Sequence, residues 1–556
     1  MKRFAGILIF ASFFASVSFC QDPELAKRID EVFKQYDRRD SPGCALAVVQ
    51  NGKLAYARGY GMANLEYDIP ITPSTVFHTG SVSKQFTAFA IALLAADGKL
   101  KLDDDIRKYL PEVADFGKPI TIRHLLYHTS GLRDQWELLA MAGWRLDDVI
   151  TQEHILKMVR HQKELNFEPG AEHLYSNTGY TLLAVIVERV SGQPFRWFAM
   201  ERIFRPLGMT STHFHDSHET VVKNRAYAYA PGSMGIYSLT ALNYANAGAT
   251  SLFTTAEDMA KWALNFEDCK VGGKAVIDQM HEVGVLNNGT KLNYAFGLTI
   301  GKYKGFSIVE HGGGDAGYRS HVLRFPEQRL AVIVHSNHAV SNPGGLSRQV
   351  ADLYLPEMPD AEAPKPPMPV QRTEVKVSPA LFDSYAGIYD LPGIMTMEIV
   401  KENDKLMAVA QGQKFELFPE SETKYFLKVV DAQIEFQKDA DGKVNQLTLH
   451  QNQQSMVAKR FVPLKADQAN LSEYIGDYYS EELGTTYSID LKDGKLIAQH
   501  RRNNDVLLTA GAKDTFSGNA WYFSKVKFTR DGANSVNGLT ISGSRVRNLK
   551  FIRRSC

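Results

Sequence analysis

The 556-residue sequence has few cysteines and no excess of either charge. Its four cysteines are too few for a framework of disulfides to hold a chain of this length. The 63 basic residues balance 62 acidic ones, which gives no reason to expect nucleic acid or an anionic membrane as a partner. Beyond the amino terminus, no apolar run is long enough for a transmembrane segment. Length and a 44% hydrophobic content predict two or three domains with sizeable cores.

The amino terminus has the pattern of an export signal. Two basic residues precede an apolar run over residues 4–17, and small residues permit cleavage before Gln21. We therefore expect a signal peptide over residues 1–20 and an exported protein, either periplasmic or extracellular. Lipid anchoring at Cys20 is an alternative, but the bulky Phe19 beside it fits a lipidation site poorly.

Helical and strand-like segments alternate over residues 22–355. The turn Asn51-Gly52 joins two strand-like segments and predicts a β-hairpin. Four later segments read as strands, at residues 294–300, 306–311, 320–325 and 330–335. The pattern predicts an α/β domain of the α+β type, an antiparallel sheet flanked by helices, with an edge strand after His311 lining a cleft.

Residues 356–375 are rich in proline and predict a stiff linker. Beyond it the sequence repeats itself, because Tyr385–Tyr389 matches Tyr474–Tyr478 at an offset of 474 − 385 = 89 residues. Each copy is a series of short alternating strands. We expect two all-β units of a small, lipocalin-like barrel type at residues 376–465 and 466–556, or two halves of one shared barrel. Whether they shape the cleft or mediate assembly stays open.

Ser81 and Lys84 stand at the start of a strongly helical pattern. Residues three apart share a helix face, so the lysine amine can reach the serine oxygen. A serine nucleophile needs such a proton acceptor. Ser421 and Lys424 have the same spacing but lead into a strand-like run, so their context disfavours a catalytic role.

Other catalytic patterns are missing. The chain has no Gly-x-Ser-x-Gly elbow. His124 and His128 are four residues apart but lack the glutamate of the metalloprotease pattern, and we expect neither a metal site nor a cofactor.

The motifs Phe77–Lys84, Ile122–Leu132, Tyr175–Asn177 and His311–Gly313 occur in the order found in the penicillin-recognising serine hydrolases. That family contains class C beta-lactamases, DD-peptidases and D-aminopeptidases, and the resemblance covers most of residues 40–340. A catalytic domain followed by two β units also resembles the D-aminopeptidase layout.

The resemblance implies a role for each motif. Ser81 would attack a carbonyl, Lys84 would accept its proton, and Tyr175 would bridge the nucleophile and the leaving group. Asn177 would hold the lysine and contact the substrate. His311, Gly312, Gly313 and Gly314 would line the substrate strand, with the backbone N–H groups of Ser81 and Gly314 forming the oxyanion hole.

Position 311 departs from the beta-lactamase pattern, which has lysine there. A histidine is mostly neutral at pH 7, so the pocket lacks a guaranteed positive charge. We therefore expect hydrolysis of small amides or peptides, D-configured and cell-wall-derived ones included, or of esters. A class C beta-lactamase or carboxylesterase is the first alternative, and a penicillin-binding sensor or scaffold without turnover is the second. Homo-oligomers are compatible with the sequence.

Overall fold

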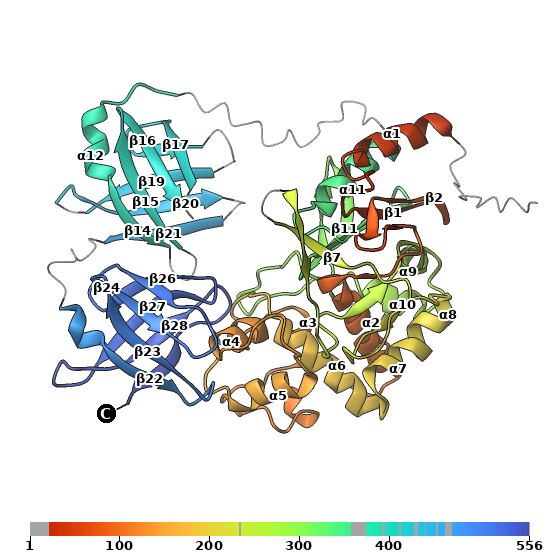
Figure 1. Ribbon diagram of the computed structural model, residues 1–556, viewed down its shortest axis with the longest axis horizontal. Coiled ribbons are helices and arrows are strands. Elements are labelled where there is room, and N and C mark those ends of the chain that lie inside the picture. Colours follow the sequence, from red (N-terminus) through yellow and green to blue (C-terminus); the bar gives the residue numbers. More distant parts are fainter. Residues whose placement is uncertain are drawn as a thin grey trace, which may run out of the picture.

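The computed structural model describes residues 22–232, 235–356, 374–391, 395–410, 413–427, 432–439, 441–451, 454–461 and 470–554. The predicted signal peptide and nearly all of the predicted linker lie outside the described residues. Figure 1 shows a mixed helix and sheet domain on one side and two barrels, one above the other, on the opposite side.

A six-stranded antiparallel sheet forms the centre of the first domain, in the order β10-β11-β12-β13-β1-β2. Asn51 and Gly52 turn the chain between β1 and β2 with positive φ angles of 51° and 77°, so the predicted hairpin is confirmed. The strands of the sheet are β1 (Cys44–Gln50), β2 (Lys53–Tyr60), β10 (Thr299–Tyr303), β11 (Phe306–Asp315), β12 (Tyr318–Phe325) and β13 (Leu330–Ser336).

The predicted strand at residues 294–300 is wrong in its bounds. β10 begins only at Thr299, and Tyr294 instead lies in a loop with its ring buried beside His311. The prediction of an edge strand after His311 also needs correction, because β11 pairs with β12 on one side and β10 on the other. The register with β10 stops at Glu310, so the half of β11 that begins at His311 extends past its neighbour and is open on that side.

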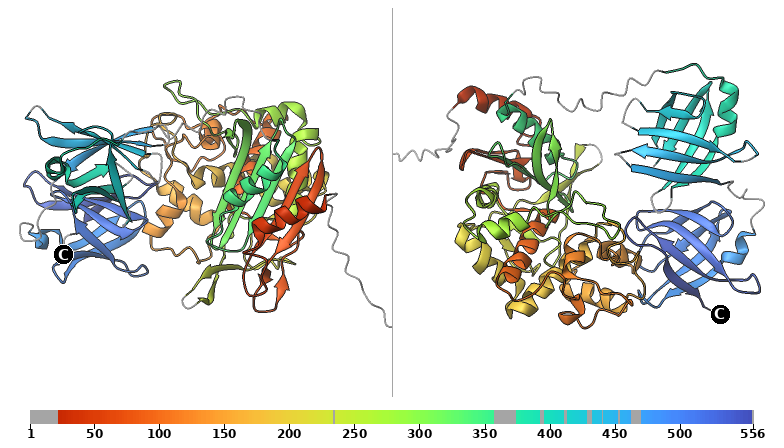
Figure 2. Two further views of the ribbon diagram at one scale, coloured as in Figure 1. Left: turned by 90° about the horizontal axis from the view of Figure 1, so that it is seen from above. Right: turned by 180° about the vertical axis from the view of Figure 1, so that it is seen from behind.

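Helices cover both faces of the sheet (Figure 2). α9 packs on β1 and β13 on one face, while α11 packs on β12 and β13 on the other. α2 lies within the larger core and is buried from Ser83 to Leu94, because its sequence is apolar on nearly every side. The helices are α1 (Pro23–Phe33), α2 (Ser83–Ala96), α3 (Ile122–Leu126), α4 (Gln135–Met141), α5 (Gln152–His161), α6 (Asn177–Ser191), α7 (Phe195–Ala199), α8 (Arg205–Leu207), α9 (Ala256–Asp268), α10 (Gly273–Gln279), α11 (Pro343–Tyr354) and α12 (Phe382–Tyr385).

Short strand pairs connect these elements. They are β3 (Met62–Asn64) with β4 (Ile69–Pro70), β5 (Phe77–His78) and β6 (His213–Phe214) on either side of β9 (Leu252–Thr254), and β7 (Ala228–Pro231) with β8 (Tyr237–Thr240). β5 leads directly into a 3-10 turn at Gly80–Val82 and then into α2.

The two C-terminal units are separate closed barrels of eight antiparallel strands each. This confirms the predicted fold class and decides between two barrels and one shared barrel. The first barrel contains β14 (Gly387–Leu391), β15 (Met395–Glu402), β16 (Lys405–Ala410), β17 (Gln413–Pro419), β18 (Lys424–Phe426), β19 (Ala432–Lys438), β20 (Val444–Gln451) and β21 (Gln454–Phe461). The second contains β22 (Gly476–Ser480), β23 (Thr485–Lys492), β24 (Lys495–Gln499), β25 (Val506–Ala510), β26 (Thr515–Ala520), β27 (Phe523–Arg530), β28 (Val536–Ser542) and β29 (Leu549–Arg553).

The sequence repeat has a structural counterpart. In the first barrel the Tyr389 hydroxyl donates to the Tyr385 carbonyl at 2.7 Å, and in the second the Tyr478 hydroxyl donates to the Tyr474 carbonyl at the same distance. Both pairs join the turn that precedes a barrel to its first strand. The repeated tyrosines are therefore core residues with a satisfied polar end.

The second barrel packs against α4 of the first domain. Leu138, Leu139 and Met141 of this helix share one apolar core with the barrel interior. Beside this core, the buried guanidinium of Arg133 donates to both carboxylate oxygens of Glu482, at 2.7 and 2.6 Å. The second barrel is thus fixed on the helix that borders the site described below.

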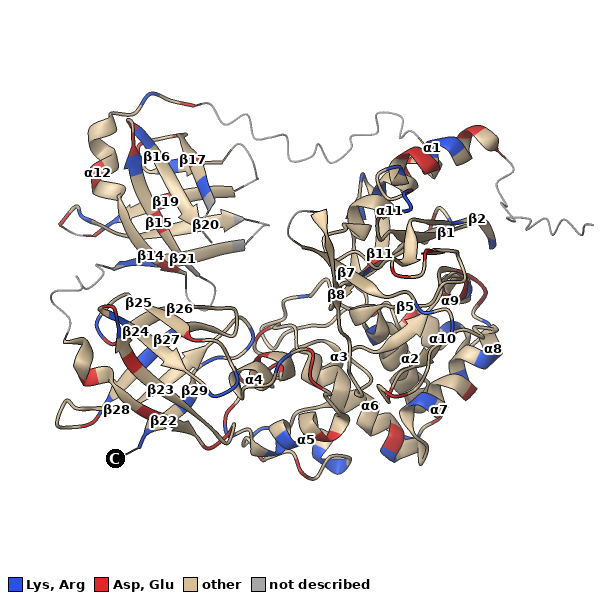
Figure 3. Cartoon of the chain, in the orientation of Figure 1, with Lys and Arg blue, Asp and Glu red and all other residues tan. Residues whose placement is uncertain are grey.

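Charges of both signs are spread over the helices and barrels, in agreement with the balanced composition (Figure 3). In the part of the chain that the structure describes, no helix combines the length and the apolar character that a bilayer crossing requires.

Candidate active site

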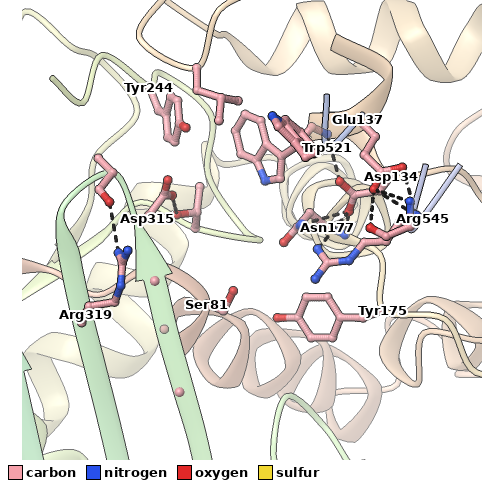
Figure 4. Close-up of a pocket in the computed structure, with 18 of the residues that line it drawn as sticks. Ser81, Asp134, Glu137, Tyr175, Asn177, Tyr244, Asp315, Arg319, Trp521 and Arg545 are labelled. Atoms are coloured by element: carbon pink, nitrogen blue, oxygen red, sulfur yellow. Dashed lines mark hydrogen bonds and ion pairs between the residues drawn. The ribbon is translucent and has the colours of Figure 1, made fainter. Parts of the chain in front are cut away.

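Ser81 lies in the 3-10 turn that opens α2, at the bottom of a pocket of about 750 Å³. The turn is held tightly, since the Ser83 hydroxyl donates to the Gly80 carbonyl at 2.6 Å and accepts from the Leu252 N–H at 3.0 Å. Gly80 adopts a φ of +53°, a left-handed conformation that glycine adopts without steric cost. These contacts hold the chain in a tight turn at Ser81, whose side chain lines the pocket (Figure 4).

Lys84 is completely buried one turn later. Its amine nitrogen lies 3.0 Å from Ser81 Oγ, and it donates to Asn177 Oδ1 and to the Ala249 carbonyl, each at 2.8 Å. Burial lowers the pKa of Lys84 to about 7, although the charges of Asp134 and Asp315 oppose the shift. A large fraction of the amine is therefore neutral at physiological pH.

Asn177 begins α6 and is itself held by Asp134. One carboxylate oxygen of Asp134 accepts from the backbone N–H of Asn177 at 2.7 Å and from its side-chain amide at 2.9 Å. The amide N–H₂ thus faces the carboxylate, and its oxygen must face Lys84. Asp134 also caps α4 by accepting from the Trp136 N–H at 3.0 Å.

Tyr175 points its hydroxyl toward Ser81 across the pocket (Figure 4). Among the described residues the buried hydroxyl has no hydrogen-bond partner, and the ring packs against His128 at 4.2 Å between centroids. The Lys84 amine lies 4.8 Å from the centre of the ring. Burial raises the pKa of Tyr175, and the nearby Ser81 hydroxyl opposes this, so the phenol stays protonated at neutral pH.

His311 is neutral under the same conditions. Its Nδ1 donates to the Gly312 carbonyl at 2.6 Å, and its Nε2 lies 3.1 Å from the Tyr294 hydroxyl. Burial lowers its pKa to about 4, and the Lys84 amine contributes to this shift. Both ring nitrogens are thus engaged within the protein, and the imidazole supplies no fixed positive charge at this position.

The glycines after His311 allow β11 to approach the Ser81 turn. A methyl group on Gly313 would lie 2.0 Å from the Thr79 carbonyl oxygen and 3.0 Å from Ser81 N. A methyl group on Gly80 would lie 2.8 Å from Gly314 N. The backbone N–H groups of Ser81 and Gly314 are thus neighbours beside the nucleophile, as an oxyanion hole requires.

The second barrel supplies one wall of the pocket. Trp521 comes from the turn between β26 and β27, and Ser544 and Arg545 come from the β28–β29 loop, residues 543–548. Glu137 of α4 holds this loop by accepting from the backbone N–H groups of Ser544 and Arg545 at 3.0 Å. The Arg545 guanidinium lies 5.0 Å from the centre of the Tyr175 ring.

The structure brings all eight predicted site residues together. Seven of them line the pocket, namely Ser81, Tyr175, Asn177, His311, Gly312, Gly313 and Gly314, and Lys84 lies directly behind Ser81. No group of three or more metal-ligating side chains occurs among the described residues. His124 caps α3, where its Nδ1 accepts from the Thr121 N–H at 3.1 Å, and His128 Nδ1 accepts from the Ser176 N–H, also at 3.1 Å.

Sequence reasoning missed Asp134, Tyr294 and Arg545. Asp134 precedes Glu137 by three residues, a pattern typical of a helix start, and this signal could have found the cap but not its reach to Asn177. Arg545 carries no local signal, because only the docking of the second barrel brings it to the pocket.

A model of the beta-lactamase family matches residues 29–355, more than half of the chain. The chain belongs to the beta-lactamase family. The first barrel lies within residues 371–461, which match a family described as a domain of unknown function (DUF3471).

Relatives of this beta-lactamase-family chain include a penicillin-binding protein of Bacillus subtilis (strain 168). It is 27% identical over 434 residues, which are 75% of this chain and 94% of the relative. A D-aminopeptidase of Gluconobacter oxydans (strain 621H) is 28% identical over 338 residues, 59% of this chain and 62% of the relative.

Among solved structures, the octameric penicillin-binding protein homologue from Pyrococcus abyssi is 26% identical. It aligns with a TM-score of 0.56 and covers 78% of this chain and 99% of its own. Our beta-lactamase-family protein is therefore a serine hydrolase related to D-aminopeptidases and penicillin-binding proteins.

Proposed function

We propose that the protein hydrolyses small amides, peptides or esters through an acyl-enzyme on Ser81. Lys84 accepts the proton of the Ser81 hydroxyl as it attacks the substrate carbonyl. Tyr175 gives its proton to the leaving group and recovers one from the Lys84 ammonium, and the N–H groups of Ser81 and Gly314 stabilise the oxyanion. Water then attacks the carbonyl of the acyl-enzyme and gives its proton to the Lys84 and Tyr175 pair, and the departing Ser81 oxygen takes a proton back from the same pair.

The hydrogen-bond pattern of Lys84 carries this proposal. A neutral amine has two hydrogens and one lone pair, and Asn177 Oδ1 and the Ala249 carbonyl occupy two donor directions at 2.8 Å. The remaining direction faces Ser81 Oγ at 3.0 Å, so the lone pair is directed at the proton that must be removed. A pKa of about 7 gives this base the strength suited to neutral pH.

His311 favours amide and ester substrates over dedicated penicillin resistance. Because its pKa is lowered to about 4, the imidazole supplies no positive charge for the carboxylate of a lactam at neutral pH. The relatedness to D-aminopeptidases supports inclusion of D-configured substrates, cell-wall-derived peptides among them.

Intact mass spectrometry tests the proposal. The protein is exposed to a fluorophosphonate, to labelled penicillin and to activated ester substrates, and the mass is followed over time. A hydrolase gains a stable fluorophosphonate adduct and a transient ester adduct, and Ser81→Ala gains neither. Failure of both reagents to modify the wild-type protein would refute the acyl-enzyme.

The same measurement separates the alternatives. A penicillin-binding sensor would retain the penicillin adduct and turn over no substrate. A beta-lactamase would cleave a chromogenic cephalosporin at high rates while ignoring D-amino-acid amides and simple esters, whereas a carboxylesterase would cleave only the esters.

We also infer export and self-association. Within residues 1–20, basic residues are followed by an apolar run and then by small residues, and this order supports export. Sequencing of the mature amino terminus should find Gln21 as the first residue. An acylated Cys20 would contradict cleavage at that position. The octameric state of the Pyrococcus abyssi homologue motivates a measurement of solution mass, in which at least twice the mass of the mature chain is expected and a monomer would contradict self-association.

A further inference from the structure

The carboxylates that line the pocket are already engaged by hydrogen-bond donors of the protein. Asp134 accepts from Asn177, and Glu137 accepts from the backbone of the β28–β29 loop. Asp315 accepts from the Thr250 hydroxyl at 2.7 Å. A carboxylate whose lone pairs are occupied in this way is poorly placed to bind the ammonium group of a substrate.

The guanidinium of Arg545 is differently placed. Its side chain is 39% exposed, its closest carboxylate contact is Asp134 at 4.0 Å, and it makes no side-chain hydrogen bond among the described residues. Arg319, the other arginine of the pocket, already donates to the carbonyls of Ala316 and Tyr318, at 3.0 and 2.7 Å. Both of these bonds come from one nitrogen of Arg319, Nη1, whereas all guanidinium nitrogens of Arg545 are without a hydrogen bond among the described residues, which leaves their N–H groups available to an anionic ligand.

The surroundings of Arg545 place its guanidinium close to Ser81. Its Cζ lies over the Tyr175 ring, and Figure 4 shows the guanidinium between Tyr175 and Asn177, facing the same space as Ser81. Glu137 anchors the backbone N–H of Arg545 itself, so the side chain starts from a fixed point. The planar guanidinium presents parallel N–H donors, which suit bidentate recognition of a carboxylate.

We propose that Arg545 is a specificity-determining residue that binds a carboxylate of the substrate, a few bonds from the reacting carbonyl. This inference rests on the proposed function and adds to it that the preferred substrates are anionic rather than free amines. The second barrel thereby supplies substrate charge recognition that residues 22–355 lack at position 311.

Matched ester pairs test the proposal. In the first pair the charge lies on the acyl part: the p-nitrophenyl monoester of glutarate is compared with the p-nitrophenyl ester of glutarate monoamide. The other puts it on the leaving group, 3-acetoxybenzoate against 3-acetoxybenzamide. The wild-type protein should show a kcat/KM ratio of about tenfold in favour of the carboxylate in one pair.

The variants assign this preference to Arg545. Arg545→Gln should bring the ratio close to one, and Arg545→Lys should retain part of it. Arg501→Gln removes the same charge from an exposed position of the second barrel outside the pocket and should leave the ratio intact. Arg545 also contributes to lowering the pKa of Lys84, but such an effect changes both members of a pair equally and cancels in the ratio.

Two outcomes would overturn the inference, namely no carboxylate preference in either pair, or a preference that Arg545→Gln retains. A binding measurement tests the same preference without turnover: calorimetry on Ser81→Ala compares binding of glutarate and glutaramide and should show an Arg545-dependent preference for glutarate. If no ester is hydrolysed and no adduct forms, the proposed function fails, while this binding contrast still decides on Arg545.

Discussion

At the scale of single residues, the site contains a lysine and a tyrosine, Lys84 and Tyr175, whose pKa values are shifted in opposite directions. Burial lowers the pKa of Lys84 to about 7 and raises that of Tyr175, so a large fraction of the amine is neutral and the phenol stays protonated at neutral pH. The sequence predicts this pair from spacing and motif order. The sequence also predicts a lysine held toward its neutral form, but not the size of either pKa shift, which depends on burial in the folded protein.

Removal of the Tyr175 hydroxyl separates its chemical role from a structural one. Tyr175→Phe should lower kcat about 100-fold, because proton delivery to the leaving group is lost. Thermal stability should hardly change, since the hydroxyl has no hydrogen-bond partner among the described residues.

Tyr180→Phe is the matched control for that variant. Tyr180 is also buried beside Lys84, 5.7 Å from the amine to the ring centre, but its hydroxyl donates to the Leu126 carbonyl at 2.8 Å. Loss of that bond should cost about 1 kcal/mol of unfolding free energy and leave kcat close to normal. Full activity of Tyr175→Phe would remove Tyr175 from the mechanism.

At the scale of elements, the approach of β11 to the turn at Gly80–Val82 brings the backbone N–H groups of Ser81 and Gly314 close together, where we propose the oxyanion hole. The strand pattern around His311 could be predicted, as could the need for small residues after it. Residues 294–298 alternate large and small side chains as a strand does, but they form a loop, and β10 begins only at Thr299. Tyr294 is buried there to meet His311, a contact that periodicity does not encode.

Gly313→Ala should disturb the close approach of β11 to the turn that carries Ser81. The added methyl group would lie 2.0 Å from the Thr79 carbonyl oxygen, so the turn that carries Ser81 must move. We expect a stability loss of about 1–3 kcal/mol by thermal unfolding and a fall in kcat/KM of at least about tenfold.

Gly312→Ala gives the comparison on the same strand. Its nearest neighbours would be His321 and Ser320 at 3.6 and 3.8 Å, which is ordinary van der Waals contact. Near-normal activity is expected for this variant. Equal losses in Gly312→Ala and Gly313→Ala would show that close approach to the turn is not the cause.

At the scale of the whole molecule, the second barrel lines the pocket and packs on the helix that borders it. It shares a core with α4, and Asp134 at the start of α4 holds Asn177, which in turn holds Lys84. The sequence predicts the barrels from their repeat. Their docking could not be predicted, because residues hundreds of positions apart form the interface and no local pattern marks them.

Two neighbouring glutamates of the second barrel test this docking. Glu482→Ala leaves the buried Arg133 guanidinium without its carboxylate and should cost about 3–5 kcal/mol of unfolding free energy, with loss of activity. Glu481→Ala breaks an exposed pair with Lys163, 3.6 Å long, and should cost less than about 1 kcal/mol. Thermal unfolding and kcat/KM compare the two, and a Glu482→Ala protein with unchanged activity would contradict the coupling.

The pH dependence of fluorophosphonate labelling tests the central claim most directly. The second-order rate of adduct formation should rise with pH through a single ionisation near 7, because only the neutral Lys84 amine can accept the Ser81 proton. Peptide mapping should place the adduct on Ser81. A rate that does not change between pH 5.5 and 8.5, or an adduct on another residue, would contradict the account.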